Sequence, residues 1–307
     1  ETAWTRIAAE MDRQVLPDGS QVELTTGYHV GVLSMFQACG DLAKEAGFAP
    51  SDAYWQRLEK MYDYSACLTK PDGSQPMPGD SWPGSLRNLL VAGAKRYNRP
   101  DLLFIGTNGR EGERPGYLDT AQRDAGYYVM RTGWTDDPQA IWVLCDVAHR
   151  WGGGHQHPDA LQLDLFAYGA TLLPDTGSYL YYGPGRAAAS RTAAHNTVTI
   201  DGNNQNTSPC RLHSFASGRL LSFCDGEQSG SPGITNRRQV VLVRPAPGVI
   251  PYLLVVDRVR GEGRHAADQW FHFRPGPLAV EPARLAARTQ ATPGPNLLVQ
   301  GLGAGAT

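Results

Sequence analysis

The chain has 307 residues, and its 28 Lys and Arg nearly balance its 30 Asp and Glu, for a formal net charge of −2. This balance argues against a polybasic nucleic-acid-binding or membrane-surface protein. With 41% hydrophobic and 19% charged residues, the sequence is that of a folded protein long enough for about two domains. No apolar run approaches the roughly 18 residues of a membrane-spanning helix. The first ten residues lack the basic start and apolar core of a signal peptide, and we expect them to belong to an internal stretch.

The first hundred residues have the apolar spacing of amphipathic helices. Asp80 and Ser81, shortly before Pro83, predict the N-cap of the last of these helices. The sequence PDGSQ occurs at 17–21 and again at 71–75, which indicates either ordinary turn chemistry or the repeated helical hairpins of a helical toroid. The predicted helical faces run over residues 4–15, 32–46, 55–62 and 86–97.

After a link rich in Gly, Pro and Arg at residues 106–116, the pattern becomes that of strands. At least eight strands without an intervening helix predict an antiparallel sandwich. The expected fold is therefore an α+β chain with two domains, a helical one over 1–108 and a β-sandwich over 109–307. The predicted strands are 127–134, 140–148, 161–173, 197–201, 219–224, 238–244, 252–259 and 269–274.

The five cysteines are odd in number and scattered, without a CxxC motif. A disulfide framework or a cysteine zinc site is therefore not expected. A single pair, such as Cys210 with Cys224, stays open.

The densest chemical signal is the segment GGGHQHPD at 152–159. His155 and His157 are two residues apart, so on an extended segment they point to the same side, as a metal site or an acid–base site requires. Asp175, after an apolar strand, and His195 could complete a zinc shell of two nitrogens and one oxygen. The alternatives are polar loop histidines, a turn aspartate and a histidine at a strand edge, and spacing alone does not decide between them.

A second candidate segment lies in the helical half, where Tyr28 and His29 stand at the start of a predicted helix. A phenol beside an imidazole could act as a pair of proton donors. The alternative is a capped helix start with an interfacial tyrosine. His149, His213, His265 and His272 have no such neighbours in the sequence and are expected to be structural.

Taken together, these segments resemble the heparinase II/III-like polysaccharide lyases, a group that includes oligo-alginate lyases. The resemblance spans roughly residues 17–275. It is carried by PDGSQVELTTGYH (17–29), GDSW (79–82), AGYYVMRTGW (125–134), GGGHQHPDALQLDLFAYGATLLPDTGSYLY (152–181) and RTAAHNTVTIDG (191–202).

The resemblance implies an (α/α) toroid joined to an antiparallel β-sandwich, and β-elimination at a uronic acid of a heparan-type glycosaminoglycan or alginate. Tyr28 matches the family's Brønsted tyrosine, and His155 matches its acid–base partner. The family's metal triad, usually zinc, falls on His157, Asp175 and His195. Since a phenol has a pKa of about 10, its use as a base needs a charged or hydrogen-bonding neighbour. His29 or Arg191 is predicted for that role and for substrate binding.

The family neutralises the uronate carboxylate with an Asn on toroid helices upstream of the tyrosine. No matching Asn precedes Tyr28 here, so we expect that residue in an upstream helical segment or a second chain. The resemblance also implies secretion or export to the periplasm. Two other functions stay open: a non-catalytic carbohydrate-binding remnant of the fold, and a zinc hydrolase that uses the His/Asp/His set.

Overall fold

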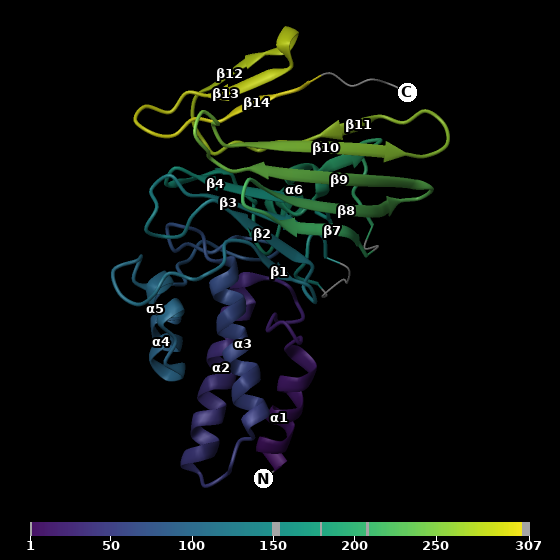
Figure 1. Ribbon diagram of the computed structural model, residues 1–307. Coiled ribbons are helices and arrows are strands. Elements are labelled where there is room, and N and C mark those ends of the chain that lie inside the picture. Colours follow the sequence, from purple (N-terminus) through teal and green to yellow (C-terminus); the bar gives the residue numbers. More distant parts are fainter. Residues whose placement is uncertain (1, 149–153, 179, 207–208, 303–307) are drawn as a thin grey trace.

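The computed structural model describes residues 2–148, 154–178, 180–206 and 209–302. Five helices lie in the first part of the chain and strands dominate the rest, so the fold is α+β (Figure 1). His149 and the first two glycines of the predicted 152–159 segment lie outside the described residues. No described helix is long and apolar enough to cross a membrane.

The helices share an apolar core that includes the fully buried side chains of Leu33, Leu58, Leu90 and Leu102. The spacing of apolar residues predicted four of these helices. The short fifth helix was not predicted, because seven residues that begin with a proline carry little periodicity. The helices are α1 (Thr2–Gln14), α2 (Thr26–Glu45), α3 (Asp52–Leu68), α4 (Arg87–Tyr97) and α5 (Pro100–Gly106).

The strands form two larger antiparallel sheets, in the orders β1-β2-β3-β4-β5 and β10-β9-β8-β7, and two small ones, β11-β6 and β12-β13-β14. The two larger sheets bury apolar side chains in one cluster, such as Val143 from the first and Leu242 from the second. The strands are β1 (Thr120–Gln122), β2 (Tyr127–Arg131), β3 (Ile141–Asp146), β4 (Leu163–Ala167), β5 (Ala170–Leu173), β6 (Val198–Ile200), β7 (Arg211–Ser217), β8 (Leu221–Ser231), β9 (Ile234–Val243), β10 (Tyr252–Arg260), β11 (Ala267–Gln269), β12 (Leu278–Glu281), β13 (Ala286–Thr289) and β14 (Leu298–Gln300).

The strand predicted over 161–173 is wrong in one respect, because it is a hairpin of β4 and β5. Ala167 pairs with Ala170, and the two residues between them, Tyr168 and Gly169, both have positive φ. A two-residue turn with positive φ at both positions usually carries Asn or Asp before Gly. Tyrosine at the first position hid the turn from the sequence pattern. Strands β1, β7 and β12–β14 and the short helix α6 (Pro184–Ala189) were also not predicted, and the strand predicted over 269–274 coincides with β11 only at Gln269.

The helical and strand regions are joined by a buried, partly polar contact. Tyr64 and Leu68 of α3 pack in one cluster with Trp142 and Phe166 of the first sheet. Within the same boundary the Nζ of Lys70 lies 2.7 Å from the Asp164 carboxylate, and both side chains are almost fully buried. Breaking such a buried pair leaves an uncompensated charge, which costs several kcal/mol. The contact therefore fixes the position of residues that the two regions contribute to a common site.

Both PDGSQ segments form turns in which an aspartate accepts hydrogen bonds from the serine two residues later. Asp18 Oδ1 accepts from the backbone and hydroxyl of Ser20, and Asp72 Oδ1 accepts in the same way from Ser74. The first segment has an additional role, since Asp18 Oδ2 accepts the backbone N–H of Ala125 just before β2. The repeated sequence is thus turn chemistry of a common kind.

The five cysteines are free thiols. Cys210 and Cys224 are both buried, and the thiol that faces Cys224 is that of Cys145 on β3. The structure therefore does not support the Cys210–Cys224 pair.

Candidate active site and metal site

The loop at 79–82, which carries the sequence GDSW, joins the start of α2 to the histidine loop between β3 and β4. Gly79 has φ of +57°, and a Cβ there would lie 2.4 Å from the carbonyl oxygen of His155, so the close approach requires glycine. The Asp80 N–H donates to that same carbonyl at 2.8 Å. Ser81 Oγ accepts the N–H of Thr26 at 3.0 Å. Ser81 was predicted to cap the fourth helix, but α4 begins only at Arg87. Its hydroxyl instead accepts a hydrogen bond from the first turn of α2.

Tyr28 lies in the first turn of α2, at the end of the helix nearest the sheets (Figure 1). Its ring centroid is 4.1 Å from that of His155 and 5.7 Å from that of Trp82, with which it makes an edge-to-face contact. Its hydroxyl is 2.7 Å from the hydroxyl of Tyr181. Burial and this hydrogen bond raise the pKa of Tyr28 to about 12. The phenol therefore holds its proton at neutral pH.

The carboxylate of Asp80 is the centre of the polar network beneath Tyr28. Its Oδ2 is 3.1 Å from Nδ1 of His155, and its Oδ1 is 3.1 Å from Nε2 of His157. Arg186 of α6 donates to both oxygens, at 2.5 and 2.8 Å. Burial would raise the pKa of Asp80, but the hydrogen bonds from Arg186 and the two histidines outweigh it and lower the pKa. The Asp80 side chain is 1% exposed, that of His157 2% and that of His155 33%, so of the two histidines His155 is the one open to a substrate.

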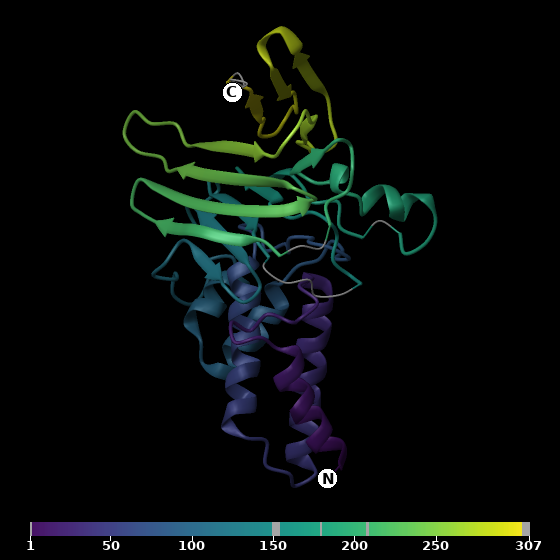
Figure 2. The ribbon, with the colours of Figure 1, turned by 90° about the vertical axis from the view of Figure 1, so that its right-hand side faces the viewer.

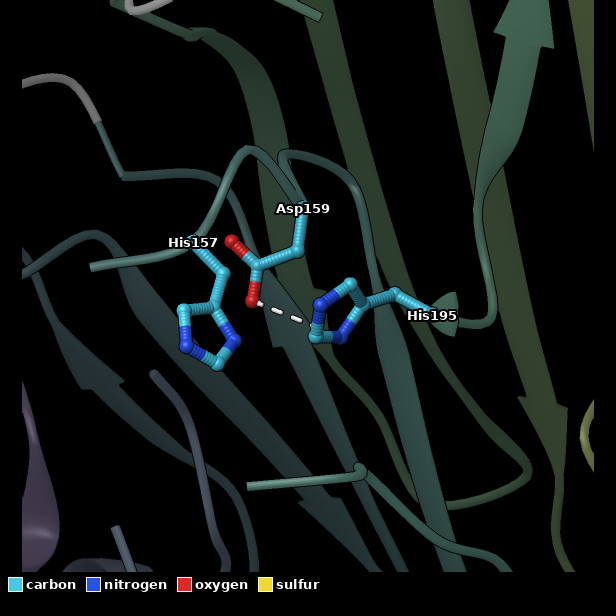
Figure 3. Close-up of side chains that lie close together, drawn as sticks. All are labelled: His157, Asp159 and His195. Carbon is cyan, nitrogen blue, oxygen red and sulfur yellow. Dashed lines mark ion pairs between the residues drawn. The ribbon is translucent and has the colours of Figure 1, made fainter. Parts of the chain in front are cut away.

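A candidate metal site lies immediately behind this network. Among the described residues, His157, Asp159 and His195 offer ligand atoms that all lie within 4.8 Å of one another (Figure 3). Nδ1 of His157 and both ring nitrogens of His195 are buried and have no well-directed hydrogen-bond partner in the described part of the chain. Nδ1 of His195 lies 3.8 Å from Asp159 and 3.4 Å from Asp175. Buried imidazole nitrogens next to carboxylates are the donor set that zinc prefers.

The charges around this site also fit a cation. Asp146 and Asp159 are buried side chains, and burial raises the pKa of both. Burial lowers the pKa of His195, but the charges of Asp175 and Asp159 outweigh it, so that the pKa is raised. Asp175 accepts hydrogen bonds from the N–H of Gly177 and from the side chain of Gln162. The structure thus places Asp159 with the two histidines and the predicted ligand Asp175 next to His195.

The segment His-Asn-Thr positions His195 through its two following residues. Asn196 donates its side-chain amide to the carbonyls of Leu163 and Pro174, both at 3.0 Å, and accepts the N–H of His272 at 2.6 Å. Thr197 Oγ1 donates to the carbonyl of Ala160. Because these partners lie on separate strands and loops, the polar side chains after His195 tie it to the histidine loop.

Of the two predicted substrate-binding residues, His29 lies buried between helices α2 and α3. His29 is 2% exposed, and its Nε2 is 3.0 Å from the carbonyl of Met61 and 3.1 Å from the hydroxyl of Ser65 on α3. Such burial does not favour contact with a substrate. Arg191 is exposed and immediately precedes the short 3-10 helix Thr192–Ala194, before His195.

The buried His29 predicts a pH-dependent stability. Burial lowers its pKa to about 4, whereas an unfolded histidine titrates near 6.5. Between these values the unfolded chain binds the extra proton, so the free energy of unfolding falls as pH drops below about 6.5. We expect a loss of about 3 kcal/mol between about pH 7 and pH 4, measured by urea unfolding. His29→Gln should lack this part of the slope and His213→Gln should keep it; equal slopes for wild type and His29→Gln would contradict the assignment.

Four residues of the site were not predicted as site residues. Asp80 lies in the GDSW segment that carries the resemblance, but its side chain was predicted only to cap a helix. Asp159 follows His157 by two residues, a spacing that could have identified it. Tyr181 is 45% exposed, and Arg186 lies on α6, a six-residue helix with no buried residue, which stands out at the side of the strand region in Figure 2. No local pattern distinguishes these two from ordinary surface residues.

Comparisons with known proteins identify the family that the chain resembles in sequence and fold. Residues 114–300 match the family model "Heparinase II/III-like, C-terminal", and residues 1–101 match "Heparinase II/III N-terminus". Curated proteins named heparin-sulfate lyase are 27% identical over the whole chain in Pedobacter heparinus and 26% identical over 96% of it in Bacteroides stercoris. The matches cover 47% and 45% of those proteins, so the chain spans about half their length. A crystal structure of a mutant heparan sulfate lyase HepC from Pedobacter heparinus superposes on 99% of the chain and 48% of its own, with a TM-score of 0.89 and 26% identity.

Proposed function

Because the chain belongs to the heparinase II/III-like family, we propose that its protein cleaves a uronate-containing polysaccharide by β-elimination. A heparan-type glycosaminoglycan is the proposed substrate, in keeping with the names of its relatives. One observation carries the proposal: Tyr28 of the helical region and His155 of the strand region lie with their rings 4.1 Å apart. These are the two side chains that the chemistry of elimination needs together.

The proposed reaction uses His155 as the base and Tyr28 as the acid. Elimination removes the proton at C5 of the uronate and protonates the departing O4 on the neighbouring carbon. With its raised pKa, Tyr28 holds its proton at neutral pH and donates it to O4. His155 is partly exposed beside it and accepts the C5 proton. The contact between the two rings supports a role for both groups at one sugar unit.

The proposal also extends to the architecture and the metal. We assign residues 1–108 to part of an (α/α) toroid and 109–307 to a β-sandwich domain, and we place the reaction outside the cytoplasm, where polysaccharide substrates occur.

His157, Asp159 and His195 would hold one zinc ion, with Asp175 beside His195. A bound zinc ion supplies positive charge that offsets the buried carboxylates. Since His157 lies two residues after His155, this site would hold the loop that carries the base.

The product of the reaction distinguishes the proposed function from its alternatives. Elimination leaves a C4–C5 double bond conjugated to the carboxylate, which absorbs in the ultraviolet, whereas hydrolysis leaves saturated ends. We expect the protein to generate this absorbance from heparan sulfate without a redox cofactor. Heparan sulfate with reduced carboxyl groups is the matched control, because it lacks the acidifying carboxylate. Saturated reducing ends would indicate a hydrolase, and binding without any cleavage would indicate a non-catalytic remnant.

A further inference from the structure

His155 and His157 present different ring nitrogens to one carboxylate. His155 directs Nδ1 to Oδ2 of Asp80, and His157 directs Nε2 to Oδ1 of the same residue, both at 3.1 Å. A separate backbone hydrogen bond, from the N–H of Asp80 to the carbonyl of His155, holds the 79–82 loop against the histidine loop. The two histidines of one motif therefore face the same carboxylate with opposite ring nitrogens.

The charge of Asp80 decides which atoms carry the protons. Arg186 donates to both carboxylate oxygens, and its guanidinium is always charged, so Asp80 is ionised and can only accept hydrogen bonds. Each histidine nitrogen that faces it must then carry the proton. A neutral imidazole has a single N–H, so the remaining lone pair is on Nε2 in His155 and on Nδ1 in His157.

The free lone pairs point to different uses. Nδ1 of His157 is buried without a hydrogen-bond partner in the described part of the chain, and His157 belongs to the cluster with Asp159 and His195. The His155 side chain is 33% exposed and lies against Tyr28. One nitrogen is thus available to a metal ion and the other to a substrate.

We propose that Asp80 is a positioning residue that fixes His155 and His157 in opposite tautomers. It leaves Nε2 of His155 free to accept a proton and Nδ1 of His157 free to bind a metal ion. Only the role of the His155 nitrogen rests on the proposed function; the assignment of the two tautomers does not. Arg186 completes the unit, because an ionised carboxylate that is 1% exposed needs a charged partner.

The tautomers can be measured directly. Long-range ¹H–¹⁵N correlation spectra of ¹⁵N-histidine-labelled protein, at a pH where the rings are neutral, distinguish Nδ1–H from Nε2–H. We expect Nδ1–H in His155 and Nε2–H in His157, before and after addition of zinc. The same tautomer in both rings, or the reverse assignment, would overturn the proposal.

The isosteric variant Asp80→Asn tests the cause. The amide has a single acceptor oxygen and its NH₂ group can only donate, so it cannot accept from both histidines. We expect one ring to change its tautomer, and kcat on heparan sulfate to fall about 10²–10⁴-fold with KM changed only a few-fold. Zinc affinity should fall about 10–100-fold where His157 is the ring that changes. Unchanged tautomers in both rings would overturn the proposal.

Two further variants separate positioning from general stability. Asp119→Asn removes a buried carboxylate that pairs with Arg244 at 2.7 Å and whose partners among the described residues include no histidine. It should therefore lower stability without changing the tautomers. Arg186→Gln removes the charged partner that keeps the buried Asp80 ionised, so it should disturb the tautomer of at least one of the two rings. A changed ring in Asp119→Asn would show that the tautomers merely follow stability. If the wild-type protein lacked lyase activity, the proposed function would fail, while the ring spectra would still decide the role of Asp80.

Discussion

Replacing Tyr28 by phenylalanine should lower kcat for elimination about 10²–10⁴-fold, which is the usual contribution of a positioned acid–base group. The substitution removes only the hydroxyl that lies 2.7 Å from Tyr181, and it leaves the ring contacts with His155 and Trp82. Because the side chain is only partly buried, we expect the free energy of unfolding to change by less than about 1 kcal/mol. Steady-state kinetics by ultraviolet absorbance, together with urea unfolding, measure both effects.

Tyr97→Phe is the matched control for this prediction. Tyr97 also donates its hydroxyl to one partner, the carbonyl of Trp55, but it lies in the helical core. We expect it to keep the wild-type kcat. A Tyr28→Phe protein with wild-type kcat would exclude Tyr28 as the proton donor. A similar loss of kcat in Tyr97→Phe would show that kcat falls on any loss of a tyrosine hydroxyl in the helical region.

The second large effect is expected at the metal site, where His195→Ala should abolish binding of one equivalent of zinc. His195 contributes ring nitrogens without a well-directed partner in the described residues, and two carboxylates lie within 4 Å of it. A ligand that binds only the folded state stabilises it by about 4 kcal/mol when its free concentration is 1,000 times Kd. We therefore expect the wild-type protein, but not His195→Ala, to lose stability when a chelator removes zinc.

His213→Ala provides the comparison, because His213 lies on β7 beside Glu227 and outside the candidate metal group. It should retain one zinc ion and the wild-type response to the chelator. Elemental analysis and thermal unfolding of the two variants give the readout. A His195→Ala protein that still bound one equivalent of zinc with unchanged affinity would rule out the proposed ligand set.

The sequence predicted elements well where local periodicity and burial agree. Helix α3 and strands β2 and β3 follow from apolar spacing, because each buries a regular set of side chains. It failed where the decisive feature was a backbone conformation, as at Tyr168 in the β4–β5 turn, or where an element is too short to carry a period, as in α5. Ser81 shows a third kind of failure: its capping chemistry was recognised, but its hydroxyl accepts from a helix 55 residues earlier in the chain.

The sequence by itself determined the α+β order, the resemblance to a family, and the segments that carry Tyr28, His155, His157 and His195. These depend on residue types and spacings along the chain. Only the tertiary structure decided that His29 is buried, that Asp159 stands with the two histidines, and that Asp80 and Arg186 join the site. The reason is physical: hydrogen bonds and ion pairs act over about 3 Å in space, and Asp80 meets partners 75 to 106 positions away, a separation that leaves no periodic trace in the sequence.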